Sequence, residues 1–295
     1  MSQVLGTATV AGTSAPVTDD RGRLRPGWNP FSPGVGSGPR TAGPLGRRPV
    51  RVALGIVVPA LLLLAWQWVT ATGRVAPYQL PSPASVWTAA VDLTERGLLG
   101  PYVAISTQRV LLGFVAGAAL GLALGSLVGL SRLAGTLLEP VLAAVRAVPS
   151  LAWVPLLILW LKIGEDSKIT LIAIGAFFPV YTTVVAALRH VDPHLVEAGR
   201  AYGLRGPRLL AAVQLPAALP AVVAGLRLGM AQAWLFLVAA ELIASSMGLG
   251  FLLTDSGQNG RVDRILLAIV LLALLGKTTD ALIGLAEKRL LRRWS

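Results

Sequence analysis

Charged residues inside apolar segments are the first candidates for chemistry in this chain. Arg146, Arg227, Glu241, Lys277 and Asp280 lie within or at the end of long apolar runs. A charge in hydrocarbon is costly unless it faces protein or water, so such residues line solute paths, act in charge relays or pair with one another. They predict either a path or structural ion pairs inside a membrane protein.

Two other patterns resemble catalytic motifs but lack essential parts. Gly276-Lys277-Thr278 imitates the end of a phosphate-binding P-loop, but Leu271 stands where that motif needs its first glycine. His190 and His194 are spaced like metal ligands on a helix, but Pro193 between them argues against a continuous helix. The sequence has no zinc-protease motif and no nucleophile elbow. We therefore expect no enzymatic activity, no cofactor and no metal site.

The composition indicates a membrane protein. Hydrophobic residues make up 54% of the chain and charged residues only 14%, too few to cover the surface of a soluble protein of 295 residues. There is no cysteine, which excludes disulfides, thiol catalysis and thiolate metal sites. The formal net charge is +12, but the basic residues gather beside apolar segments, as they do in membrane proteins. We expect contact with membrane lipid and none with nucleic acid.

The chain divides into a polar tail and a membrane domain. Residues 1–50 are basic, rich in Gly and Pro, and without an apolar period, which predicts a disordered cytoplasmic tail. The first apolar segment begins near Val52, too late for a secretory signal, so we expect the tail to be retained. Residues 51–295 predict an all-α, polytopic transmembrane domain, because each apolar run can cross a hydrocarbon core of about 30 Å. The six predicted spans are about 52–72, 107–130, 138–161, 169–188, 217–242 and 265–285.

The second predicted span carries a glycine at every fourth position. Such a ladder leaves a bare stripe along the helix, and in lipid a stripe of small residues lets another helix pack at close range. A cofactor-binding glycine loop would need a preceding strand and a different spacing. We therefore expect a helix-packing face formed by Gly113, Gly117, Gly121, Gly125 and Gly129.

Polar residues in the third, fifth and sixth spans are candidates for a translocation path. At 1.5 Å per residue, Arg227 lies about 15 Å past the start of its span, near the middle of the bilayer. Arg146 and Arg227 favour an anion in transit if they face a water-filled cavity, or they are structural if they pair with carboxylates such as Glu241 or Asp280. Lys277 and Asp280 are three positions apart and can pair with each other. The path candidates are Arg146, Ser150, Trp153, Arg227, Glu241 and Lys277.

A polar, basic loop, residues 189–216, separates the fourth and fifth spans. Asp192 can cap a short helix that begins at Pro193 and runs through Tyr202. Gly203 suits the left-handed residue that ends such a helix, and Gly206-Pro207 suits a second helical start. The loop is therefore expected to hold two short helices at an angle.

This loop resembles a known family signature. It reads Glu197-Ala198-Gly199, three residues, Gly203, nine residues, then Val213-Gln214-Leu215-Pro216. The pattern is similar to the cytoplasmic signature of inner-membrane permease subunits of binding-protein-dependent ABC importers, Glu-Ala-Ala, three residues, Gly, nine residues, Ile-x-Leu-Pro. The chain departs from it at Gly199 and Val213, both small or conservative changes.

The resemblance implies a coupling loop that docks into a groove on a separate ABC ATPase subunit. The residues that match the signature and would form this dock are Glu197, Ala198, Gly199, Gly203, Leu215 and Pro216. A patch of small side chains at Ala198 and Gly199 would permit a close approach to such a groove. The resemblance further implies ATP use by the partner, an extracytoplasmic solute-binding protein and a homodimer of this subunit in the bacterial inner membrane.

The stretch from Leu80 to Trp87 resembles the aliphatic sulfonate, taurine and nitrate branch of these permeases, and implies a small anionic solute. In this stretch Ser82 can cap a surface helix that starts at Pro83. Most of the 26 Lys and Arg residues fall in the two tails and the 189–216 loop, which predicts that both termini are cytoplasmic.

Two alternatives remain from other classes. One is a secondary transporter or channel driven by an ion gradient, in which the intramembrane charges form a relay. The other is a structural membrane subunit without transport, which would leave the charges near mid-bilayer without a role. The coupling signature disfavours the first, because a gradient-driven carrier has no use for an ATPase dock.

Overall fold

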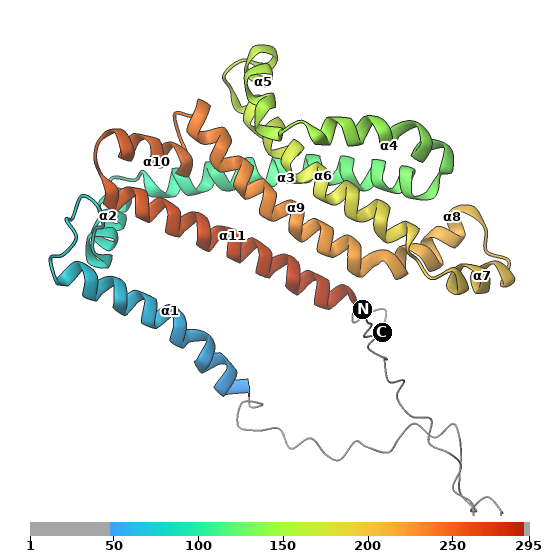
Figure 1. The fold of residues 1–295 in the computed structure, drawn as a ribbon, viewed down its shortest axis with the longest axis horizontal. Helices are drawn as coiled ribbons and strands as arrows, with labels where there is room; N and C mark the ends of the chain where they lie inside the picture. The colour runs from blue at the N-terminus through green and yellow to red at the C-terminus, as the bar shows by residue number, and fades with distance from the viewer. Residues whose placement is uncertain (1–47, 292–295) are drawn as a thin grey trace, which may run out of the picture. The chain divides into compact units, whose positions relative to one another are not determined.

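The computed structural model describes residues 48–291, and residues 1–47 of the predicted tail lie outside that range. The chain divides into two units, residues 1–59 and 60–295, and all packing described below lies within the second. The helices, drawn in Figure 1, are α1 Arg48–Ala71, α2 Pro83–Glu95, α3 Leu99–Leu130, α4 Arg132–Ala147, η2 Ser150–Trp153, α5 Val154–Leu161, α6 Glu165–Arg189, α7 Pro193–Ala201, α8 Gly206–Leu209, η3 Leu210–Gln214, α9 Leu215–Ala244, α10 Leu249–Gln258 and α11 Val262–Leu291.

The helix starts that the sequence predicts at Pro83 and Pro193 are confirmed. Ser82 Oγ accepts a hydrogen bond from the amide of Ser85 at 3.2 Å, and Pro83 occupies the first turn of α2. Asp192 Oδ1 accepts one from the amide of His194 at 2.9 Å, and Pro193 begins α7. Each cap satisfies an amide that has no partner inside the helix.

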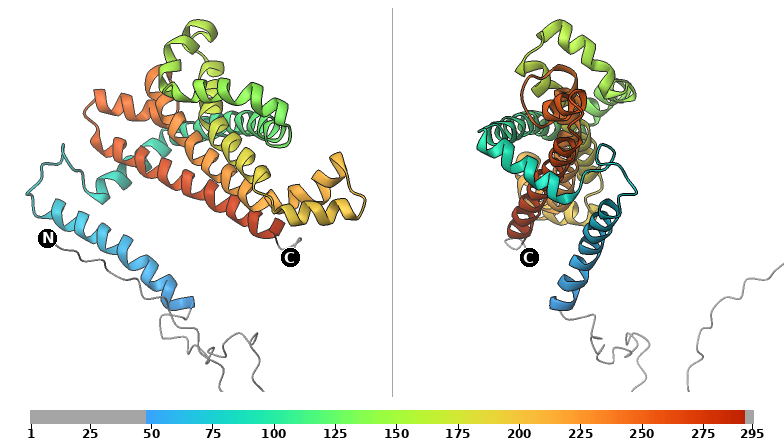
Figure 2. Two further views of the ribbon diagram at one scale, coloured as in Figure 1. Left: turned by 45° about the vertical axis from the view of Figure 1, so that its right-hand side comes forward. Right: turned by 90° about the vertical axis from the view of Figure 1, so that its left-hand side faces the viewer.

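Long helices form the core by packing in the order α3, α6, α9 and α11, and the left view of Figure 2 shows α6, α9 and α11 side by side. The interior is apolar, with Val110 and Ile172 at 0% exposure and Leu237 of α9 equally buried. Dense packing of this kind is what fixes one helix against the next when the surroundings are as apolar as the interior.

The glycine ladder of α3 faces α6. A Cβ atom at Gly113 would lie 2.5 Å from Ile172 Cγ2, and one at Gly117 would collide with the carbonyl oxygen of Ala173. The next three glycines meet side chains on successive turns of α6, namely Val180, Val184 and Leu188. The two backbones therefore approach to a distance that residues with side chains would not allow.

The predicted third span, 138–161, is not one helix. It is replaced by α4 and by the η2–α5 segment, which are bent by 87° at a short break. The break falls at Val148, which is extended (φ −72°, ψ 125°) and precedes Pro149. A residue before proline is pushed out of the helical region by the proline ring, which explains the break.

The segment between the fifth and sixth predicted spans contains a helix, α10. Gly248 has a φ of +123°, and α10 begins at the next residue. The first amides of α10 bond to distant side chains, Leu249 N to Ser106 Oγ at 2.9 Å and Gly250 N to a Glu241 oxygen at 2.7 Å. Because these caps come from α3 and α9, local sequence carries no sign of them.

Within residues 48–291, four segments are long and apolar enough to cross a membrane: α3, α6, Gly206–Ile243 and α11. The bent pair of α4 with η2–α5 adds a fifth if it counts as one span. The apolar part of α1, Val57–Ala71, is shorter. The chain is therefore an all-helical, polytopic membrane protein.

Candidate functional site

The 189–216 loop folds into two short helices that connect α6 to α9 (Figure 1). Gly203 ends α7 with a φ of +80°, and the amide of Leu204 bonds to the carbonyl of Gly199 at 3.0 Å, as in a left-handed helix stop. After α8 comes one π-helical turn, Leu210–Gln214, that leads into α9 at Leu215. Both predicted helices are present, and the chain has the predicted left-handed residue at Gly203.

Gly199 is buried inside this loop, which differs from the expectation that its small size serves a partner. A Cβ atom there would lie 2.7 Å from Leu209 Cδ1 and 3.0 Å from Val213 Cγ2. The glycine therefore lets α7 pack on α8 and the π-helical turn. Its neighbour Ala198 is exposed.

The exposed surface of the loop carries charged side chains, a large aromatic ring and apolar side chains. The side chain of Glu197 is 73% exposed, and Tyr202 at the end of α7 is 88% exposed. Leu215, in the first turn of α9, is exposed as well, whereas Pro216 is half-buried. Tyr202 was not among the predicted dock residues, although a large aromatic in a polar loop could have drawn attention to it.

A charge cluster that is buried except for Glu165, whose side chain is 51% exposed, lies at the other end of α6 and was not predicted from the sequence. Arg109 of α3 has a side chain only 3% exposed, and it forms two bonds of 2.6 Å to the carboxylate of Glu165. Its third bond, also 2.6 Å, reaches Glu241 of α9, whose side chain is fully buried. Lys168 pairs with Glu165 at 3.0 Å. Two cations thus balance two carboxylates.

Further hydrogen bonds close this Arg109 cluster. Ser106 Oγ donates to Glu241 at 2.8 Å, and Arg109 donates to the carbonyl of Met247 at 2.6 Å. The cluster joins α3, α6, α9 and the start of α10. Glu241, a predicted path candidate, therefore has its carboxylate oxygens occupied by protein donors, an arrangement typical of a structural network.

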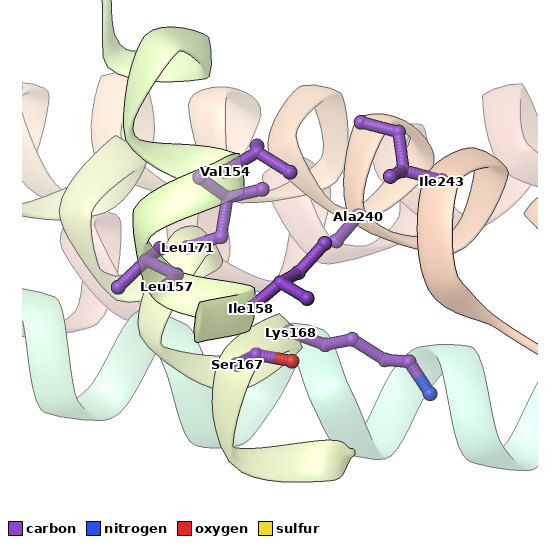
Figure 3. Close-up of a pocket in the computed structure, with 8 residues that line it drawn as sticks. All are labelled: Val154, Leu157, Ile158, Ser167, Lys168, Leu171, Ala240 and Ile243. Atoms are coloured by element: carbon purple, nitrogen blue, oxygen red, sulfur yellow. The ribbon is translucent and has the colours of Figure 1, made fainter. Parts of the chain in front are cut away.

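The space beside this cluster is too small for a solute. Figure 3 shows Lys168 and Ser167 of α6 beside the apolar side chains of Val154, Leu157 and Ala240. The cavity that these residues line measures about 10 Å³, which is room for one water molecule at most.

A second ion-pair group joins α9 to α11. Arg227 contacts Asp280 at 2.8 Å and Glu287 at 3.4 Å, and Lys277 contacts Asp280 at 3.8 Å. The Lys277–Asp280 pair that the spacing suggests is present, but Arg227 is the nearer partner of Asp280. Arg227 is half-buried, and Lys277 is 81% exposed.

Arg146 differs from the other path candidates. It lies in the last turn of α4, is exposed, and forms no ion pair or side-chain hydrogen bond with any residue that the structure describes. It lines a cavity of about 350 Å³ together with Tyr181, Thr182 and Arg189 of α6. Ser150 and Trp153 lie beyond the bend, in η2.

Comparisons with known proteins agree with this architecture. Residues 117–292 match the family model described as the inner membrane component of binding-protein-dependent transport systems. A Bacillus subtilis (strain 168) protein named as an aliphatic sulfonates transport permease, SsuC, is 40% identical over 238 residues, covering 81% of this chain and 86% of the relative. The taurine transport system permease protein TauC of Escherichia coli (strain K12) is 33% identical, covering 84% and 90%.

A solved structure has the same fold. A chain of the MetNI methionine ABC transporter, in an inward-facing conformation, aligns with a TM-score of 0.58 at 23% identity, covering 68% of this chain and 98% of that one. A binding-protein-dependent ABC system implies an ATPase and a binding protein beside the permease. The chain belongs to the family of inner-membrane components of binding-protein-dependent transport systems, and it is the permease subunit of an ABC transport system and not itself an enzyme.

Proposed function

We propose that this permease belongs to an ATP-driven importer of small anionic solutes, with aliphatic sulfonates as cargo and taurine and nitrate as related solutes. The names of the two relatives support this solute class. The cavity that Arg146 lines supports it as well, because a cation in a water-accessible cavity favours an anion.

The coupling loop is the observation that carries the proposal. Its two short helices lie between two long apolar helices and expose Glu197, Ala198 and Tyr202. A short helix with an exposed aromatic residue suits a groove on a partner protein. We assign the ATPase to that partner. Gly203, Leu215 and Pro216 would act by setting the directions of α7 and α9, and Gly199 by letting α7 pack on α8 and the π-helical turn.

The full topology is six spans with both termini in the cytoplasm. α1 has 24 residues, about 36 Å of helix, and would supply the first span. α4 with η2–α5 would supply the third. The excess of Lys and Arg in the tails and the coupling loop supports the cytoplasmic side for all three. We expect two copies of this subunit to form the path between them, with one ATPase on each.

Reconstitution tests the energy source. Proteoliposomes would contain the permease, its ATPase and its binding protein. They should take up a labelled alkanesulfonate only when ATP is present on the side of the membrane that carries the ATPase. Ionophores that collapse proton and sodium gradients should leave uptake unchanged. Uptake that needs no ATP and stops with the ionophores would support the gradient-driven alternative and refute the proposal. The purified permease alone should neither bind nor hydrolyse ATP.

A further inference from the structure

Two adjoining cavities lie between α6 and the α4–η2–α5 segment. One is apolar, about 410 Å³, and the other is the basic cavity of about 350 Å³ that Arg146 lines. Leu142 of α4 lines both, so the two cavities adjoin at this residue. We call the pair the α4–α6 groove.

The basic end of the groove has hydrogen-bond donors for an anion. Arg189 is partly neutralised, since it pairs with Glu139 at 2.6 Å and donates to the carbonyl of Val128 at 3.2 Å. Arg146 has no such partner among the described residues, which leaves a net positive charge at this end. The Tyr181 hydroxyl forms no hydrogen bond within residues 48–291, so it can donate to a ligand.

The apolar end begins directly beside the basic one. The ring of Tyr181 stacks on Phe177, with centroids 5.7 Å apart and an angle of 14°. Phe177 lines the apolar cavity together with Phe178, Trp153 and Trp160. From Tyr181 back to Ile174, which also lines it, α6 rises about 10 Å, room for an alkyl chain of several carbons.

We propose that the α4–α6 groove binds the cargo as an amphiphile, with an alkanesulfonate head at Arg146 and its alkyl chain against Phe177 and Trp153. The identity of the cargo rests on the proposed function. The site itself rests on the two adjoining cavities and on Arg146, a cation without a partner among residues 48–291. Of the six path candidates, the geometry selects Arg146 and Trp153, because Arg227 and Glu241 are held by carboxylates or by Arg109 and Ser106.

A single introduced thiol can report on the basic end, because the chain has no cysteine. Ala143→Cys places it at an exposed position of the basic cavity. The permease would be held in nanodiscs of zwitterionic lipid and treated with a methanethiosulfonate reagent carrying an ethylsulfonate group, or with its trimethylammonium counterpart of similar size. Relative to a free thiol in solution, the anionic reagent should react about tenfold faster than the cationic one, because fixed charge in a cavity concentrates counter-ions.

Paired arginine variants identify the source of that preference. Adding Arg146→Gln to Ala143→Cys should remove most of the preference for the anionic reagent. Arg132→Gln is the matched control, since Arg132 is an exposed arginine of the same helix and lines neither cavity. It should leave the preference unchanged. Equal rates for the two reagents, no reaction with either, or the same loss in both variants would overturn the proposal.

Chain length tests the apolar end. Alkanesulfonates from ethane- to hexanesulfonate should protect the Ala143→Cys thiol, each added methylene tightening protection by up to about fourfold. Trp153→Ala should flatten this dependence on chain length, whereas Arg146→Gln should weaken every member of the series by about tenfold. Protection by hexyltrimethylammonium as strong as that by hexanesulfonate would contradict an anion site.

Other occupants would give distinct results. Protection by added anionic phospholipid and not by hexanesulfonate would make the groove a lipid site, and would overturn the proposal. Two copies of the Ala143→Cys variant could also form a disulfide with each other. If hexanesulfonate does not prevent that disulfide, a second copy covers the groove, and the proposal is overturned. If the groove binds alkanesulfonates but the reconstituted complex imports none, the proposed function fails and the groove stands. If uptake is normal in Arg146→Gln and Trp153→Ala, the groove fails and the function stands.

Discussion

Both ends of α6 lie beside arginines and carboxylates, but the charges balance at one end and leave an excess of positive charge at the other. At its first turn Glu165 and Lys168 join the buried Arg109 cluster, in which two cations meet two carboxylates. Near its last turn Arg189 meets one carboxylate, Glu139, and Arg146 meets none among the described residues. An arginine is thus structural where carboxylates use its donors and is available to a ligand where they do not.

The packing of α3 against α6 also differs between these two ends of α6. The closest contact of a Cβ atom built on the α3 ladder is 2.5 Å at Gly113 and shorter still at Gly117, 2.9 Å at Gly121 and Gly125, and 3.1 Å at Gly129, toward the Arg189 end. The neighbour at Gly117 is backbone, whereas at Gly129 it is the side chain of Leu188. The two helices therefore approach most closely toward the Arg109 cluster and least closely near Arg189.

Removing Arg109 should have the largest effect. Arg109→Met leaves Glu241 buried without its cation, and breaking a buried pair on one side costs about 3–5 kcal/mol. We expect little folded protein in the membrane, measured as the yield of monodisperse permease after extraction. The double variant Arg109→Met, Glu241→Met should recover much of that yield, because Lys168 still pairs with Glu165. Wild-type yield and thermal stability in the single variant would contradict the structural role.

Substitutions in the glycine ladder of α3 should have the next largest effect on stability. Gly117→Ala should lower stability by about 2–3 kcal/mol, since the new methyl group meets the backbone of α6. Gly129→Ala should cost under about 1 kcal/mol, because the nearest atom, Leu188 Cβ at 3.1 Å, needs to move by only a few tenths of an ångström. Thermal unfolding of the two variants in one detergent compares them directly. An equal loss in both would mean that the two ends are packed alike.

Arg146→Gln should leave the stability within about 0.5 kcal/mol of wild type, as for surface positions without partners. This small effect on stability contrasts with the large one expected for Arg109→Met, on the neighbouring helix α3. The measurement is the same thermal unfolding, with Arg132→Gln as reference. A destabilisation of Arg146→Gln as large as that of Arg109→Met would place Arg146 in a structural network.

The smallest effect on stability is expected from an exposed ion pair, Asp92 with Arg96. Hydrogen bonds from Arg96 at 2.8 Å and, less strongly, from Arg264 hold the pKa of Asp92 below its usual value near 3.8. Because the folded pKa is lowered, the carboxylate contributes stability above pH 3.8 that is lost as the pH falls through the folded pKa. The difference in melting temperature between wild type and Asp92→Asn should be small, constant above about pH 5, and should shrink below pH 3.8. A difference that grows on acidification would have the wrong sign.

The sequence predicted what local chemistry determines. Caps at Ser82 and Asp192 and the left-handed Gly203 follow from residue types and spacing, and the structure has them. The long apolar helices follow from the absence of charge over some 20 residues. These features need no knowledge of neighbours in space.

What the sequence missed depends on residues far apart in the chain. Arg109 and Glu241 are 132 positions apart, and α10 begins with caps supplied by Ser106 and Glu241. Gly199 was assigned to a partner surface because its packing against Leu209 and Val213 depends on how the loop folds back. Pro149 did signal the break in the third span, but its position inside an apolar run favoured a single helix.

The most direct test of the permease account is cross-linking of the coupling loop to the ATPase. Single cysteines at Ala198 and Tyr202, both exposed on this loop, should cross-link to the ATPase in the assembled complex. Tyr78→Cys, in a residue 72% exposed but outside the loop, is the control and should not. Cross-links from both loop positions and none from Tyr78 are the predicted result. A complex that co-purifies intact but cross-links only through Tyr78→Cys would show that the ATPase docks elsewhere, and would contradict the account.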